Sequence, residues 1–107
     1  MEIRFYTTPA GNSPVEKYLE GLEPKERVLL LEAFEDLRQQ GIGGSRVVTR
    51  QIESKLWEIK VSRHRVFYVT VAGPTLVLLH AYKKQSAKAP RAEINVARTR
   101  LKEVQNG

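Results

Sequence analysis

The chain has 107 residues, about the size of one domain, and 41% of them are hydrophobic, which is enough for a single core. It has no cysteine, which excludes disulfides and thiolate metal sites, and carboxylates do not cluster near its two histidines. No apolar segment suits a signal peptide or a membrane span. We therefore expect a cytoplasmic protein that contacts no membrane and needs no metal or cofactor.

The charge of the chain is uneven along its length. The net charge is +6, but residues 1–45 hold five Lys or Arg against eight Asp or Glu, and residues 46–107 hold thirteen against four. A basic half suggests a surface for a polyanion such as a nucleic acid. The alternative is that these basic residues only solvate strands and a terminal helix.

The first half of the chain predicts one strand and two helices. Alternation favours a short strand within residues 1–6. Ser13 followed by Pro14 is typical of a helix start, and this helix is expected to end at about residue 20. A second helix begins at Pro24 and ends in the glycines after residue 40. Its expected apolar stripe consists of Val28, Leu30, Leu31, Phe34 and Leu37.

The second half predicts a sheet followed by one helix. Residues 46–54 are polar and are expected to be an extended approach to the sheet. Three strands joined by short turns form an antiparallel meander over residues 55–61, 65–71 and 75–83. A loop over residues 84–89 leads to a last helix that starts at Pro90. Helices and strands are segregated, so we predict an α+β fold in a single domain over residues 1–107.

Basic residues lie near the ends of the predicted strands. Lys60 and Arg65 are expected near one edge of the sheet, and whether Lys84 joins them depends on the strand register. Because strand residues alternate between faces, the side of Trp57 is expected to be buried, and Glu58 with Lys60 to be exposed. Such a surface could bind RNA phosphates.

RNA cleavage by its own 2′-hydroxyl needs a proton acceptor, cations for the charged phosphorus and a proton donor. Glu58, His64 and His80 are candidates for proton transfer, as are crowded lysines. The plainer interpretations are a core histidine for His80, an exposed turn residue for His64, a strand-end aromatic for Tyr82 and a salt-bridge partner for Glu58. Arg65 opens an apolar run, where a charge needs a partner or a ligand.

Three motifs and the order of the elements carry a family resemblance. The motifs are Leu56-Trp57-Glu58-Ile59-Lys60, Arg65-Val66-Phe67-Tyr68 and Leu79-His80-Ala81-Tyr82-Lys83-Lys84. They are followed by Pro90 and a helix with Glu93-Ile94 and Ala97. Together they resemble the RelE/ParE superfamily of bacterial toxins, and in particular its phage-derived, HigB-like branch. The implied RelE-like fold has an N-terminal strand, a helical hairpin, the three-stranded meander and a C-terminal helix.

The resemblance implies the toxin of a type II toxin–antitoxin pair that cleaves mRNA on the ribosome without a metal. The implied partners are the ribosome, mRNA and an antitoxin, often a helix-turn-helix protein. Glu58 stands where some relatives carry Lys, so the proton-transfer roles stay open. The alternatives are a ParE-like toxin that binds DNA gyrase without cutting, and a plain RNA-binding module. The candidate catalytic residues are Arg65, Lys60, Lys84, Lys83, His80, Tyr82 and Glu58.

Overall fold

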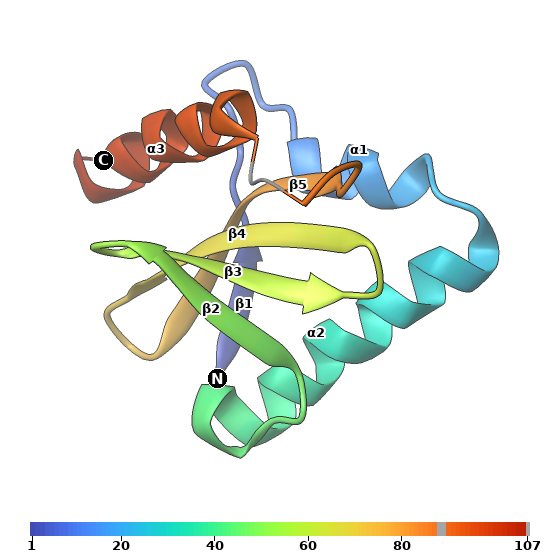
Figure 1. Ribbon diagram of the computed structural model, residues 1–107. Helices are drawn as coiled ribbons and strands as arrows, with labels where there is room; N and C mark the ends of the chain where they lie inside the picture. The colour runs from blue at the N-terminus through green and yellow to red at the C-terminus, as the bar shows by residue number, and fades with distance from the viewer. Residues whose placement is uncertain (88–89, 107) are drawn as a thin grey trace.

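The computed structural model describes residues 1–87 and 90–106, and in these ranges it has five strands and three helices (Figure 1). The predicted α+β class is confirmed. Of the expected loop, Lys88 and Ala89 lie outside the described residues, as does Gly107, which was expected to follow the last helix. In chain order the elements are β1 (Glu2–Phe5), α1 (Pro14–Glu20), α2 (Pro24–Gly44), β2 (Val48–Glu53), β3 (Leu56–Val61), β4 (His64–Val71), β5 (Thr75–Lys83) and α3 (Arg91–Asn106).

The strands form one mixed sheet in the order β1-β5-β4-β3-β2. β1 runs parallel to β5, and the other neighbours are antiparallel. The meander therefore has four antiparallel strands, and the prediction that residues 46–54 only approach the sheet is wrong. β2 has a bulge between Gln51 and Glu53 and forms one edge of the sheet. An edge strand is half solvated, so its polar sequence gives a weak strand signal.

Helices cover both faces of the sheet. The hairpin of α1 and α2 packs on one face, and α3 packs on the other, over β3, β4 and β5 (Figure 1). The hairpin side buries Val15, Leu19, Leu30, Phe34, Leu37, Ile59, Val66, Tyr68, Leu76, Leu78 and Ala81. The α3 side buries Tyr6, Leu56, Phe67, Val69, Val77, Leu79, Tyr82 and Ala97. This double burial explains why β4 and β5 are apolar on both faces.

The first two helices begin where the sequence predicts, and α3 begins one residue later than predicted, at Arg91. Ser13 has the extended backbone of a cap, but its side chain makes no cap hydrogen bond. α2 continues to Gly44 across Gly41, whose φ of 73° suits glycine. Its buried residues are Leu30, Ala33, Phe34 and Leu37, which share one helical face. The expected stripe is therefore wrong at Val28 and Leu31, which are 49% and 46% exposed.

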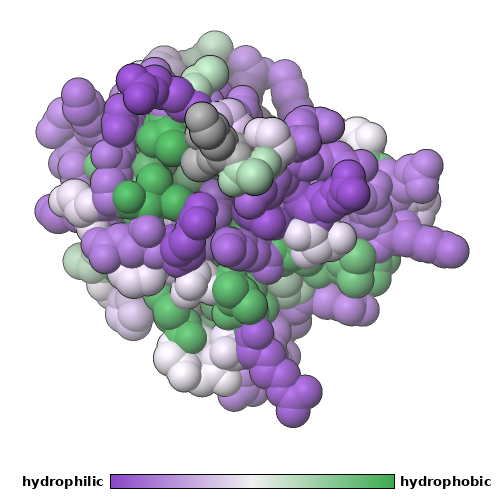
Figure 2. Space-filling model, in the orientation of Figure 1, coloured by the Kyte–Doolittle hydropathy of each residue, from purple (hydrophilic) through white to green (hydrophobic). Residues whose placement is uncertain are grey.

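The surface in view is mostly hydrophilic, with separate hydrophobic patches (Figure 2). Within residues 1–87 and 90–106, none of the helices combines the length and the apolar character that a bilayer crossing requires.

Candidate nucleic-acid-binding site

The strand register brings several predicted site residues onto one face of the sheet. Lys60 on β3 lies opposite Arg65 on β4, and Arg65 lies opposite Tyr82 on β5. The next row along the strands pairs Glu58 with Phe67, and Phe67 with His80. Directly paired residues share a face, and so do residues two apart in a strand. Five of the seven candidates therefore share the α3 side of the sheet: Glu58, Lys60, Arg65, His80 and Tyr82.

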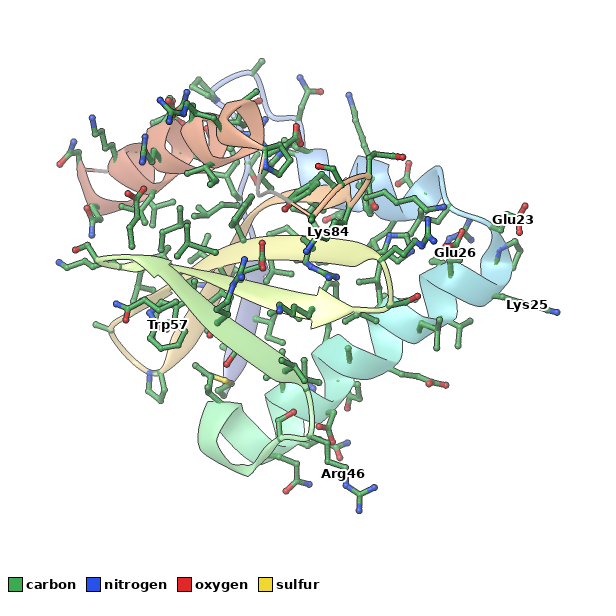
Figure 3. All side chains as sticks on the ribbon, in the orientation of Figure 1. Glu23, Lys25, Glu26, Arg46, Trp57 and Lys84 are labelled. Carbon is green, nitrogen blue, oxygen red and sulfur yellow. The ribbon has the colours of Figure 1, made fainter. Side chains whose placement is uncertain are left out.

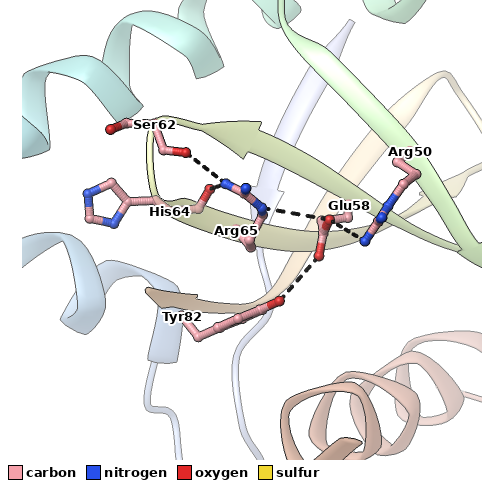
Figure 4. Close-up of polar contacts among 6 residues, drawn as sticks. All are labelled: Arg50, Glu58, Ser62, His64, Arg65 and Tyr82. Carbon is pink, nitrogen blue, oxygen red and sulfur yellow. Dashed lines mark hydrogen bonds and ion pairs between the residues drawn. The ribbon is translucent and has the colours of Figure 1, made fainter. Parts of the chain in front are cut away.

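Glu58 is fully buried, so the prediction that it is exposed is wrong. Its Oε1 lies 3.2 Å from Nη2 of Arg50 and 4.0 Å from Nε of Arg65 (Figure 4). The Tyr82 hydroxyl donates a long hydrogen bond of 3.5 Å to Oε2 (Figure 4). A carboxylate without solvent needs such partners, because burial of an unpaired charge is costly. Glu58 is thus enclosed by two guanidinium groups and one hydroxyl.

Arg65 is held in a defined orientation at the β3–β4 turn. Its side chain is only 11% exposed. Its Nη1 donates to the carbonyl oxygens of Ser62 at 2.8 Å and of His64 at 3.0 Å (Figure 4). Because Nη1 is directed to the backbone and Nε faces Glu58, the guanidinium is fixed from two sides. The expectation that a charge at this position has a partner is met by protein groups.

Lys83, the last residue of β5, and Lys84, which follows it, lie in different places. Lys84 lines a hollow of about 370 Å³ together with Arg65 and Arg63. Its backbone N–H donates to the carbonyl of Arg63 at 2.7 Å. Lys83, by contrast, pairs with His64 across the strands, and its Nζ lies 3.9 Å from Glu26 of α2, which is labelled in Figure 3. The register therefore places Lys84 beside Arg65, whereas Lys83, one residue earlier in the chain, faces the hairpin side.

His64 is buried, and the prediction that it is exposed in a turn is wrong. It is the first residue of β4, and its Nδ1 lies 2.6 Å from the Tyr18 hydroxyl. Its Nε2 lies 3.0 Å from Oε1 of Glu26. Burial, and then the carboxylates of Glu26 and Glu93, raise the pKa of Tyr18 to about 12. Both ring nitrogens of His64 are therefore engaged, one by the hydroxyl of α1 and the other by the carboxylate of α2.

His80 lies beneath α3 with both ring nitrogens engaged. Nδ1 accepts a hydrogen bond of 3.1 Å from Arg100, because an arginine can only donate. Nε2 then carries the proton and donates to Glu93 at 3.0 Å. The ring also lies beside Phe67 and Tyr82, at centroid distances of 6.3 and 6.5 Å, and these two rings stack on each other. This geometry favours a role in fixing α3 on the sheet over a role in proton transfer.

Tyr82 is a candidate proton donor. Its side chain is buried, and burial, followed by the Glu58 carboxylate, raises the pKa of its hydroxyl. The hydroxyl therefore stays protonated at neutral pH. It lies in the same cross-strand row as Arg65 and Lys60.

Arg50 belongs to this group of side chains, although the sequence assigns it no role. It lies on β2, directly opposite Glu58. Val48, Arg50 and Ile52 are spaced two residues apart and therefore share one face of β2, so the sequence offers no polar–apolar alternation that would mark the arginine. In the part of the chain that the structure describes, no three His, Asp or Glu side chains are grouped so that they could hold a metal ion.

The fold and the site define a RelE-like α+β domain with cationic side chains on one sheet face. Residues 17–102 match the family model described as "Phage derived protein Gp49-like (DUF891)". Since this match spans most of the chain, the protein belongs to the Gp49-like phage-derived family, a RelE-like family of toxin-like proteins. No curated protein matches the chain.

Proposed function

We propose that this protein is the toxin of a type II toxin–antitoxin pair of the HigB-like branch, and that it cleaves mRNA on the ribosome without a metal. The observation that carries the proposal is the row of Lys60 and Arg65 on one face of the sheet, with Tyr82 beside them. Family membership supports the coarser part of the proposal, a toxin-like protein.

The proposed reaction is attack of the RNA 2′-hydroxyl on the neighbouring phosphorus. The 2′ oxygen loses its proton to solvent water, the new bond closes a 2′,3′-cyclic phosphate, the bond to the 5′ oxygen breaks, and that oxygen takes up a proton. Arg65 and Lys60 stabilise the charge that develops on the phosphoryl oxygens. Tyr82 keeps its proton at neutral pH and lies beside Arg65, so we assign to it the donation to the leaving oxygen.

The proposed partners follow from the same face. The ribosome places the mRNA over it, and a helix-turn-helix antitoxin inhibits the toxin by covering the face or by blocking entry to the ribosome. The uneven charge of the chain supports a negatively charged ligand for the basic half.

Induced expression in bacteria tests the proposal, with Arg65→Ala as the variant and Arg38→Ala as the control. Arg38 is an exposed arginine of α2 that is paired with Glu35. The wild type and the control should arrest translation rapidly and leave cleaved transcripts, whereas Arg65→Ala should not. A DNA-damage response that precedes translation arrest would instead indicate a gyrase-binding toxin. Normal growth with folded wild-type protein would contradict both activities.

A further inference from the structure

Arg50 is the most solvent-open charged residue around Glu58. Its side chain is 48% exposed, whereas that of Glu58 is 0% exposed. One nitrogen, Nη2, donates to Glu58 Oε1 at 3.2 Å. A guanidinium has five N–H donors in a rigid plane, so this one bond fixes the group without using its full donor capacity.

The charges around Glu58 do not cancel. Arg50 and Arg65 both approach the same carboxylate oxygen, at 3.2 and 4.0 Å, so the two nitrogens are at most about 7 Å apart. One carboxylate faces two guanidinium groups, which leaves an excess positive charge at the β2 side of the site. Lys60 adds to this excess, because it is two residues from Glu58 on the same strand and face.

We propose that Arg50 is a further RNA-phosphate-binding residue and that Glu58 is the residue that positions it. This inference rests on the proposed function, and it extends the binding face from the row of Lys60 and Arg65 to the edge strand β2. The ligand is the backbone of a single RNA strand long enough to place one phosphate at Arg65 and another at Arg50. The planar guanidinium suits this contact, since it matches the geometry of phosphate oxygens.

The plain alternative is that Arg50 only neutralises a buried carboxylate. That role requires little exposure, and Glu58 already has Arg65 and the Tyr82 hydroxyl as partners. The two roles differ in a measurable way. A neutralising arginine affects stability alone, whereas a phosphate-binding arginine also affects how RNA affinity depends on salt, because each phosphate contact releases counterions.

The experiment measures binding of the full chain to a fluorescently labelled, single-stranded RNA of mixed sequence at several salt concentrations. Arg50→Ala should bind three- to tenfold more weakly at low salt and should reduce the slope of log affinity against log salt by about 0.7. Arg50→Lys should retain most of the slope, because the charge is kept. The matched control is Arg38→Ala, since Arg38 is 53% exposed and also paired with a glutamate, but on α2.

Thermal unfolding first checks that the Arg50→Ala variant is folded. If this folded variant shows the same slope of log affinity against log salt as Arg38→Ala, the inference is overturned while the proposed function stays intact. A wild type that binds no RNA at any salt concentration would also overturn the inference, whereas the proposed function is tested separately by induced expression.

The positioning role of Glu58 is tested by a double-mutant cycle with Glu58→Gln, which keeps the size of the side chain and removes its charge. If Glu58 positions Arg50, the loss of RNA affinity caused by Arg50→Ala should shrink in the Glu58→Gln background. Additive effects on affinity would overturn this part of the inference.

Discussion

His64 should be a major contributor to stability even though it lies beside an exposed turn. Its imidazole is fully buried and joins Tyr18 of α1 to Glu26 of α2. It therefore fastens both helices of the hairpin to the first residue of β4. We predict that His64→Ala destabilises the fold by much more than a substitution of its exposed neighbour Arg63.

The magnitude follows from what the substitution removes. Two hydrogen bonds, of 2.6 and 3.0 Å, are lost, each with a net value of about 1 kcal/mol. The Tyr18 hydroxyl loses its partner, and the space of the ring becomes a cavity, which together add about 1–2 kcal/mol. We expect a total loss of about 3 kcal/mol in the free energy of unfolding. For a domain of this size, that corresponds to a fall in Tm of about 15 °C.

Urea and thermal unfolding followed by circular dichroism at neutral pH measure the effect. Tyr18→Phe should cost about 1–2 kcal/mol, and the double variant should cost less than the sum of the single variants, because both disrupt the same hydrogen bond. Arg63→Ala is the control and should stay within about 0.5 kcal/mol of the wild type. A His64→Ala protein that melts within about 3 °C of the wild type would refute the reasoning, as would strict additivity with Tyr18→Phe.

Three further predictions concern the site, α2 and alkaline pH. Arg65→Ala should abolish growth arrest while the purified domain still unfolds cooperatively. Arg65→Lys should also be impaired, because a lysine cannot reproduce both carbonyl contacts and the approach to Glu58. Full growth arrest by folded Arg65→Ala would reject the assignment. Leu30→Ala should cost about 2–5 kcal/mol in unfolding free energy, and Leu31→Ala less than about 0.5 kcal/mol, since Leu30 is buried and Leu31 is exposed. Equal costs would show that the buried face of α2 is assigned incorrectly. The pKa of Tyr18 is raised from its ordinary value of 10 to about 12 in the folded protein. The protonated hydroxyl therefore contributes its full stabilisation below pH 10, and this contribution is lost as the pH rises through 12. Urea unfolding at pH 9 and pH 11 should therefore show a smaller alkaline loss for Tyr18→Phe than for the wild type, and an equal loss would contradict the argument.

The parts of the fold with strong local signals could be predicted from the sequence. Pro14 and Pro24 mark the starts of both hairpin helices, and β5 occupies the predicted residues. β2 could not be identified in the same way, because an edge strand such as Val48–Glu53 needs few apolar residues. Its assignment depends on pairing with β3, which is a tertiary contact.

The candidate site was harder to predict because its geometry depends on layers and register. The alternation of β3 indicates which residues share a face, but the exposure of Glu58 depends on what covers that face. The arginines of β2 and β4 enclose it. The opposite directions of Lys83 and Lys84 follow from strand alternation, whereas the position of Lys84 beside Arg65 depends on the register of β5 against β4. His64 was misplaced because the strand begins one residue earlier than predicted.

The parallel pairing of β1 with β5 has a consequence for synthesis of the protein. The first strand made is joined to the last of the five described strands, since Ile3 lies beside Leu76. Such distant pairing requires closure of a long loop and is intrinsically slow. While the chain emerges from its own ribosome, β1 must wait until β5 has been translated, so this edge of the sheet is completed late in translation.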